Sequence, residues 1–263
     1  MKNKIAIIVV YLGEFPRLFD LTRKTAKFNK DYDWLIFNDQ YENEFRDGNL
    51  RFIPSSLDDV NIRLNYALGG GVAINRPQKL ADVRPVFGKM YAKYLEQYEW
   101  FGWSDLDVIY GNFNNYINDE VLDKNEFIGY INKTLFGPFA FFKKSSCQDL
   151  YLNIENINNL INNDGPFKGN NSVDETHFGN IVRDKLKIYD KNLVTGTQNR
   201  LIGHGKNKLP LHWQEGDLHL DTFKNDFPED YYNKYGDCSM VVHLPKAETF
   251  TVVFRKNNDF SIY

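Results

Sequence analysis

The run of residues 4–11 is the sequence feature that most constrains what this chain can fold into. After Lys4 it contains only Ile, Ala and Val until it reaches Tyr11. An unbroken apolar run of this length is typical of a strand that is buried on both faces, which occurs mainly in parallel sheets. Parallel strands are joined by crossover connections, usually helices, so the run predicts an α/β protein.

The rest of the chain supports this class with alternating helical and extended segments. Apolar residues recur at helical spacing between Phe87 and Tyr98, which predicts one helix whose aromatic face lies in the core. A similar pattern predicts another helix over residues 147–162. Further apolar segments predict a short helix at residues 19–28 and strands at residues 32–37, 50–53 and 100–103.

The composition narrows the classes of function. The chain has 263 residues, of which 42% are hydrophobic and 25% are charged, as in ordinary globular proteins. Its 32 Lys and Arg residues are outnumbered by 35 Asp and Glu residues, which gives a net charge of −3. Proteins that bind nucleic acids neutralise phosphates with a basic surplus, so we expect no nucleic-acid partner.

The sequence also favours a cytoplasmic protein. Its longest apolar run, from Ile5 to Leu12, is about half the length of a membrane-spanning helix, and no small-residue cleavage pattern of a secretory signal follows it. Cys147 and Cys238 form no CxxC or zinc-binding spacing, which fits a reducing compartment. A peripheral association with the inner face of the cytoplasmic membrane is left open.

Asp105 and Asp107 form the most informative motif. They flank Leu106 directly after the predicted strand at residues 100–103. In an extended backbone, residues two apart point to the same side, so both carboxylates can face one point. A divalent cation would relieve their repulsion, and hard oxygen ligands suit Mg²⁺ or Mn²⁺. The alternative is that one carboxylate caps a turn while the other is solvated.

One of the five histidines of the chain could complete such a metal site. His243 follows an apolar segment and has Lys246 three residues later, so one side chain could bind the metal and the other a phosphate. His204, on a glycine-flanked segment, offers a similar pairing with Lys206, and His212 precedes Trp213. We favour His243, because the end of a strand positions a ligand more firmly than a glycine-flanked loop.

An acidic pair, Asp174 and Glu175, opens another predicted helix. The spacing from Ser172 to Glu175 matches a capping box, which would give Glu175 a structural role. Asp174 is not explained in that way, which leaves it as a candidate for a chemical role. The alternative for Asp174 is stabilisation of the first helical turn. Upstream, Gly137 would allow a close approach of the backbone to a ligand.

Several of these segments together resemble a known group of enzymes. The stretch Lys79-Leu-Ala-Asp82-Val-Arg84-Pro85, the aromatic helix after it, and Trp103-Ser-Asp105-Leu-Asp107-Val-Ile-Tyr-Gly111-Asn112 look like small bacterial glycosyltransferases of the GT-A fold. These enzymes build capsule, O-antigen and similar surface polysaccharides. The opening and closing segments of the chain fit the same pattern, although only the central block is specific.

The resemblance implies one α/β GT-A-like domain over residues 1–263, with a mixed, mostly parallel Rossmann-type sheet flanked by helices. Residues 1–112 would bind a nucleotide-sugar donor, with a UDP-sugar favoured, and residues 113–263 a glycan or lipid-linked glycan acceptor. Asp105, Asp107 and His243 would hold Mn²⁺ or Mg²⁺ on the diphosphate. The implied cofactor-binding residues are Tyr11, Asp39, Lys79, Asp82, Asp105 and Lys246, and the implied catalytic carboxylates are Asp174 and Glu175.

Two other functions are compatible with the same residues. Paired aspartates and a histidine would also serve a metal-dependent hydrolase of phosphate or sugar esters. Trp103, Trp213 and the many tyrosines could instead form stacking platforms in a non-catalytic carbohydrate-binding protein. The helical spacing of most of the aromatics indicates a core position, which argues against the binding protein.

Overall fold

The structure is a computed structural model that describes residues 5–131, 133–163 and 172–189, together with short strands at residues 194–195, 211–214, 217–220, 241–243, 252–254 and 260–262. The chain divides into two compact units. The first consists of residues 1–15, 30–106 and 119–190, and the second of residues 16–29, 107–118 and 191–263. The single domain predicted from the resemblance, with halves that meet at residue 112, stays a prediction.

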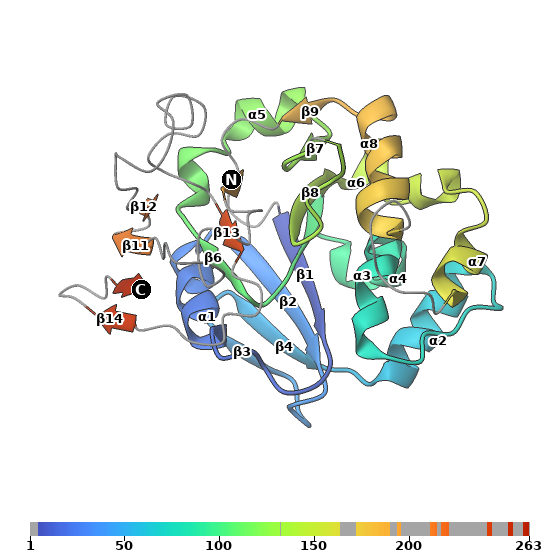
Figure 1. Ribbon diagram of the computed structural model, residues 1–263, viewed down its shortest axis with the longest axis horizontal. Coiled ribbons are helices and arrows are strands. Elements are labelled where there is room, and N and C mark those ends of the chain that lie inside the picture. The colour runs from blue at the N-terminus through green and yellow to red at the C-terminus, as the bar shows by residue number, and fades with distance from the viewer. Residues whose placement is uncertain are drawn as a thin grey trace, which may run out of the picture. The chain divides into compact units, whose positions relative to one another are not determined.

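An eight-stranded sheet forms the centre of the first unit, in the order β3-β4-β2-β1-β5-β8-β7-β9. Its strands are β1 (Ile5–Tyr11), β2 (Tyr32–Asn38), β3 (Phe45–Asp47), β4 (Leu50–Pro54), β5 (Trp100–Ser104), β7 (Phe127–Ile128), β8 (Phe139–Lys143) and β9 (Ile188–Tyr189). Strands β1, β2, β4 and β5 are parallel, and β7 is parallel to β9, whereas β3 and β8 run antiparallel to their neighbours. Figure 1 shows β1, β2 and β4 side by side in blue.

This sheet confirms the predicted α/β class, with a mixed, mostly parallel sheet and flanking helices. The helical segments of the first unit are α2 (Leu57–Leu68), η1 (Pro77–Lys79), α3 (Leu80–Val83), η2 (Arg84–Val86), α4 (Phe87–Met90), η3 (Ala92–Leu95), α5 (Asp119–Lys124), α6 (Lys144–Cys147), η5 (Leu150–Asn153), α7 (Ile157–Asn162), η7 (Val173–Phe178) and α8 (Gly179–Lys185). Among the described residues, no helix has the length and apolar character that crossing a membrane requires.

The buried strands follow directly from the sequence. Residues 5–9 of β1 and all of β2 and β5 are buried, as the apolar runs predicted. On one face of the sheet, Ile8 of β1 and Phe37 of β2 belong to a hydrophobic core that includes Leu64 of α2, Val83 of α3 and Phe87 of α4. These helices therefore cover that face of the sheet.

The prediction of one continuous helix between Phe87 and Tyr98 is wrong, because the segment is divided into two short helices. Its apolar side chains are buried as expected, but α4 ends at Met90, Tyr91 leaves the helical conformation, and η3 follows as a separate 3₁₀ turn. A Cβ at Gly88 would lie 2.7 Å from Cζ of Phe101, so α4 packs very closely on β5. The core packing therefore overrides the periodicity of the sequence.

The predicted helix over residues 147–162 is also broken, into the end of α6, η5 and α7. Asn156 has φ of 54°, in the left-handed region, which interrupts a right-handed helix. Side chains of α7 then hold the glycine loop that ends α2, because Asn158 donates to the carbonyl of Gly70 at 3.2 Å and Asn162 to that of Gly71 at 2.9 Å.

The second unit contains α1 (Phe19–Phe28), β6 (Val108–Tyr110) and η4 (Phe113–Asn115). The side-chain amide of Asn29 donates to the carbonyl of Gly111 at 2.8 Å and accepts from the backbone N–H of Phe113 at 2.8 Å. Two small sheets have the orders β10-β13-β6 and β12-β11-β15-β14. Their other strands are β10 (Val194–Thr195), β11 (Leu211–Gln214), β12 (Asp217–Leu220), β13 (Val241–His243), β14 (Val252–Phe254) and β15 (Phe260–Ile262).

Candidate functional site

The carboxyl ends of β1 and β2 carry the first group of predicted site residues. Tyr11 and Asn38 are paired at the ends of these parallel strands. The backbone N–H of Gly13 donates to both carboxylate oxygens of Asp39, at 2.9 and 3.1 Å. In open α/β sheets, ligands bind beyond the carboxyl ends of the strands, so Tyr11 and Asp39 lie at the end of the sheet where a donor is expected.

The carboxylate of Asp39 is exposed and ionised. Its slight burial raises its pKa, but hydrogen bonds from the Gln40 side chain and from the Gly13 backbone outweigh this effect, and the net pKa is lowered. A charged and accessible acceptor can hydrogen-bond to the hydroxyl groups of a ribose. The cofactor-binding role of Asp39 stays a prediction.

Lys79 and Asp82 form a buried ion pair in which Nζ lies 2.6 Å from Oδ2. Their side chains are only 3% and 6% exposed. The ammonium of Lys79 also donates to the carbonyl of Asn163 at 3.0 Å, and Oδ1 of Asp82 accepts from the backbone N–H of Val173 at 3.1 Å. These contacts connect η1 and α3 to the segments around α7 and η7, and they support a structural role. The predicted cofactor-binding role of the pair stays untested.

Arg84 is the centre of a polar network in the first unit. Its Nη2 forms an ion pair with Oδ1 of Asp105, which follows β5. Its Nη1 donates to Oδ2 of Asp174 at 3.1 Å and to the carbonyl of Gly137 at 2.9 Å. A single guanidinium therefore binds one carboxylate of the DxD motif, one carboxylate of the acidic pair, and the loop before β8.

The loop at Gly137 fits closely against the acidic pair. Its carbonyl also accepts a hydrogen bond from Nε1 of Trp103 at 2.8 Å, and the carbonyl of Glu175 accepts one from the backbone N–H of Leu135 at 2.9 Å. A Cβ at Gly137 would lie 2.7 Å from Oε1 of Glu175 and 3.0 Å from Oδ2 of Asp174. Only glycine leaves this space open beside both carboxylates.

The acidic pair lies in η7, which is a single stretch of π-helix. The N–H groups of Thr176 and His177 both donate to the carbonyl of Ser172, at 3.2 Å each. The predicted capping box is wrong, because the side chain of Ser172 makes no capping hydrogen bond. The wider π turn satisfies the backbone in another way, and π-helical turns occur frequently at functional sites.

Asp174 and Glu175 differ in their accessibility. Asp174 is only 2% exposed, whereas Glu175 is half-buried. Oδ1 of Asp174 accepts from the backbone N–H of Glu175 at 2.8 Å, and Oδ2 accepts from Arg84. Burial raises the pKa of Asp174 to about 7, although the guanidinium of Arg84 opposes this increase. Asp174 can therefore change its protonation state near neutral pH.

Asp107 lies at the start of the second unit's β6, and it is half-buried. In the small sheet, the backbone of His243 in β13 is paired with Val108, the residue that follows Asp107. Among the residues that the structure describes, no group of three His, Cys, Asp or Glu side chains is placed to hold a metal ion. The metal-binding roles of Asp105, Asp107 and His243 stay predictions.

Some predicted residues lie outside the described ranges. Lys246 and His204 are among them, as is the side chain of His243, of which only the backbone strand is described. Sequence reasoning quoted Arg84 within the resembling motif but assigned it no role. An arginine between a valine and a proline forms no distinctive motif, and only its partners far away in the chain reveal what it binds.

Comparisons with known proteins add a family but little about activity. A family model described as a family of unknown function (DUF6625) matches residues 7–263. No curated protein matches the chain. A solved structure described as a glycosyltransferase involved in the glycosylation of the major capsid of PBCV-1 is 11% identical, with a TM-score of 0.43, and the match covers 92% of this chain and 93% of that one. A likeness of this size is too weak to assign an activity.

Proposed function

The chain belongs to the DUF6625 family, whose function is unknown, and from its own site residues we propose that it is a glycosyltransferase. It transfers a sugar from a nucleoside diphosphate donor to a glycan or lipid-linked glycan acceptor. The sequence resemblance to GT-A enzymes of surface polysaccharide synthesis favours a UDP-sugar donor, a hexosyl group and a cytoplasmic location.

The observation that carries the proposal is the bridge that Arg84 makes between Asp105 and Asp174. In glycosyl transfer, the anomeric carbon is bonded to the diphosphate that leaves. Groups that bind the diphosphate and groups that act on the sugar or the acceptor must therefore lie within a few ångströms of one another. The DxD motif and the acidic pair, about 70 residues apart in sequence, meet this requirement through one guanidinium.

Arg84 and the two carboxylates of the acidic pair have different roles in the proposed reaction. Arg84 is a positioning residue that holds Asp105 and Asp174 in fixed orientations. Asp174 is almost fully enclosed, so its most direct effect is on Arg84 and on the backbone of Glu175. Glu175 is more exposed, and beside the space above Gly137 its carboxylate would meet the transferred sugar or the acceptor hydroxyl. In an inverting reaction, that carboxylate would accept the hydroxyl proton.

Two of the three candidate metal ligands, Asp105 and Asp107, are carboxylates of the kind that binds a hard divalent cation. Asp105 and Asp107 both have partly accessible carboxylates, and oxygen ligands of this kind are preferred by Mg²⁺ and Mn²⁺. His243 is the candidate for a third ligand, because the register of β6 and β13 brings its backbone next to the residue after Asp107. When bound there, the ion would neutralise charge on the departing diphosphate.

At the donor end of the sheet, Tyr11 and Asp39 would contact the nucleoside. Asp39 keeps its negative charge, and its orientation is set by Gly13 and Gln40. This arrangement would let Asp39 accept hydrogen bonds from ribose while the ring of Tyr11 supports the base. Lys246 remains the candidate for a cation on the leaving diphosphate.

The proposal is tested by the thermal unfolding of the full chain with nucleotide and metal. A ligand that binds only the native state stabilises it by about 2.7 kcal/mol at 100 times its Kd. Mn²⁺ with UDP or GDP should raise Tm of the native protein and of an Asp123→Asn control, but not that of Asp107→Asn. Asp123 is an exposed residue of α5, so Asp123→Asn removes one carboxylate, as Asp107→Asn does, but away from the proposed site.

The outcome that overturns the donor site is the absence of any shift with every nucleoside diphosphate tried. If the shift occurs and free sugar is released faster than it is transferred to any glycan acceptor, the protein is instead a hydrolase. Binding of glycan that needs neither nucleotide nor metal would favour a carbohydrate-binding protein.

A further inference from the structure

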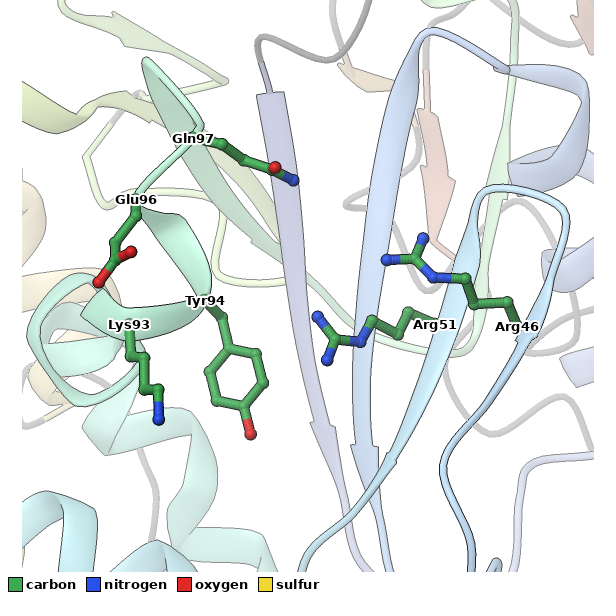
Figure 2. A pocket seen from close by; sticks show the side chains of 6 residues that line it. All are labelled: Arg46, Arg51, Lys93, Tyr94, Glu96 and Gln97. Atoms are coloured by element: carbon green, nitrogen blue, oxygen red, sulfur yellow. The ribbon is translucent and has the colours of Figure 1, made fainter.

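A pocket lies in the first unit, between η3 and the β3–β4 pair (Figure 2). Its volume is about 460 Å³, and it is lined by Arg46, Arg51, Lys93, Tyr94, Glu96 and Gln97. Figure 2 shows the two arginines extending from the strands toward the side chains of η3 and the residues that follow it. Three of the six lining residues are cations, and one is a carboxylate.

The two arginines are held close together despite their like charges. Arg46 of β3 is directly opposite Arg51 of β4 in the antiparallel register, and like charges placed opposite each other destabilise a strand pair. Nε of Arg51 has one carboxylate partner, Oε1 of Glu44, at 2.7 Å. The guanidinium carbon of Arg51 also lies 5.4 Å from the centre of the Tyr94 ring. Arg51 is therefore held in place at the wall of the pocket.

Among the described residues, the other two cations have no carboxylate at ion-pair distance, although Arg46 is near enough to Glu44 to help to lower the pKa of that carboxyl. In the described part of the chain, the side chains of Arg46 and Lys93 form no ion pair or hydrogen bond. Both side chains are exposed, and both line the same cavity as Arg51. An anion bound between them would offset the repulsion of Arg46 and Arg51 and would accept charge-assisted hydrogen bonds. The fork of a guanidinium matches the geometry of a phosphate.

This pocket is separate from the donor end of the sheet. Glu96 and Gln97 precede β5, and Arg51 of β4 is paired with Leu35 in the middle of β2, so these lining residues lie before the carboxyl ends of the parallel strands. Asp39 and Gly13 follow the carboxyl ends of β2 and β1. The residues that line the pocket are therefore different from those that follow the carboxyl ends of β1 and β2.

We propose that Arg46, Arg51 and Lys93 form a binding site for a phosphate group, distinct from the donor site. The phosphate belongs either to a soluble phosphorylated ligand or to the head group of an anionic or lipid-linked molecule. In both cases the recognition chemistry is the same: two guanidinium groups and one ammonium surround the anion, and Tyr94 and Gln97 add polar contacts. The proposal is independent of the glycosyltransferase assignment, because it needs no nucleotide and no metal.

The test measures binding of inorganic pyrophosphate to the full chain by titration calorimetry in the presence of EDTA, so that metal-dependent binding does not contribute. The wild-type protein should bind saturably. The double variant R46Q/K93Q should bind about tenfold more weakly or worse, while K124Q/K185Q, which removes the same charge from exposed lysines of α5 and α8, should bind like wild type. The two variants have the same net charge, so the comparison separates the pocket from general electrostatics.

A second measurement identifies the source of the phosphate. Flotation with phosphatidylcholine vesicles that contain phosphatidic acid is compared with flotation with phosphatidylcholine alone. Binding to the acidic vesicles that is lost in R46Q/K93Q and kept in K124Q/K185Q assigns the site to a lipid head group, whereas pyrophosphate binding alone assigns it to a soluble ligand. The proposal is overturned if the wild-type protein binds neither probe, or if the two double variants lose binding equally.

Discussion

Arg84 precedes Asp174 by 90 residues in the chain, yet its Nη1 lies 3.1 Å from Oδ2 of that carboxylate. The same guanidinium forms an ion pair with Asp105 through Nη2. The side chain of Arg84 is only 14% exposed, so water cannot readily replace these contacts. The two carboxylates therefore depend on one side chain for their relative positions.

We expect Arg84→Lys to lose activity while keeping the fold. Lysine retains the charge, but its single nitrogen cannot bind Asp105, Asp174 and the carbonyl of Gly137 in the planar arrangement of a guanidinium. Misplacement of groups around a reacting centre typically costs about 100-fold in rate. Sugar transfer by Arg84→Lys is compared with that of Arg183→Lys, in which an exposed arginine that donates to the carbonyl of Lys133 is changed in the same way. Full kcat in Arg84→Lys would show that the bridge is dispensable.

Gly137→Ala is expected to impair turnover more than stability. The added Cβ would press on the carboxylates of Asp174 and Glu175, of which Glu175 is proposed to act on the sugar or acceptor and Asp174 to bind Arg84. The matched control is Gly88→Ala, whose Cβ would lie 2.7 Å from the ring of Phe101 in the core. We expect the control to lower the free energy of unfolding by about 1–3 kcal/mol with kcat per folded molecule unchanged. If both variants lose only stability, the space beside Gly137 has no functional role.

The stability of the protein should depend on pH through Asp174. Its pKa is raised from the model-compound value of 3.8 to about 7, so the native state binds the proton more strongly than the unfolded chain. The stabilisation is complete below the unfolded pKa and is lost as the pH rises through about 7. Each pKa unit corresponds to about 1.4 kcal/mol, so the loss is on the order of a few kcal/mol.

This pH dependence can be isolated with Asp174→Asn, which has no proton to release. Urea unfolding is measured across the range from about the unfolded pKa to above the native one, and the wild-type curve is compared with the variant curve. The difference in unfolding free energy should move in favour of the variant as the pH rises. A difference that is independent of pH would mean that Asp174 is ionised throughout the range in the native state.

Asp82→Asn should destabilise the fold. It leaves the ammonium of Lys79, which is 3% exposed, without its carboxylate partner, and breaking a buried ion pair typically costs about 3–5 kcal/mol. The double variant Lys79→Met with Asp82→Asn removes both charges and should recover part of this loss. Chemical denaturation measures both effects. If Asp82→Asn keeps the wild-type stability but loses the nucleotide-dependent shift in Tm, then its role is in donor binding instead.

The elements that were predicted well are those whose burial can be inferred from the residues of the segment itself. The strands β1, β2, β4 and β5 are encoded by short apolar runs that are followed by polar residues, glycine or proline, and α1 begins and ends at the predicted residues. Burial on both faces of a strand requires consecutive apolar residues, so this information is present in each segment alone. The hairpin strand β3 has two exposed residues, and it could not be recognised in that way.

The helices were predicted less well because their regularity depends on what they pack against. The apolar positions between Phe87 and Tyr98 are buried, but α4 and η3 are separate segments. The acidic pair was predicted at a helix start, and it lies there, yet as a π-helical turn and not as a capping box. In both cases the close contacts with other segments determine the backbone path.

The sequence by itself determined the α/β class, the central buried strands and the types of side chain available for chemistry, because these depend on local composition and spacing. Only the tertiary structure decided which of those side chains meet. Arg84 joins Asp105 to Asp174, and Gly137 leaves space beside Glu175, whereas Lys79 and Asp82 are buried against each other. These contacts join residues far apart in the chain, and their free energy depends on distance and burial in space, which no local pattern records.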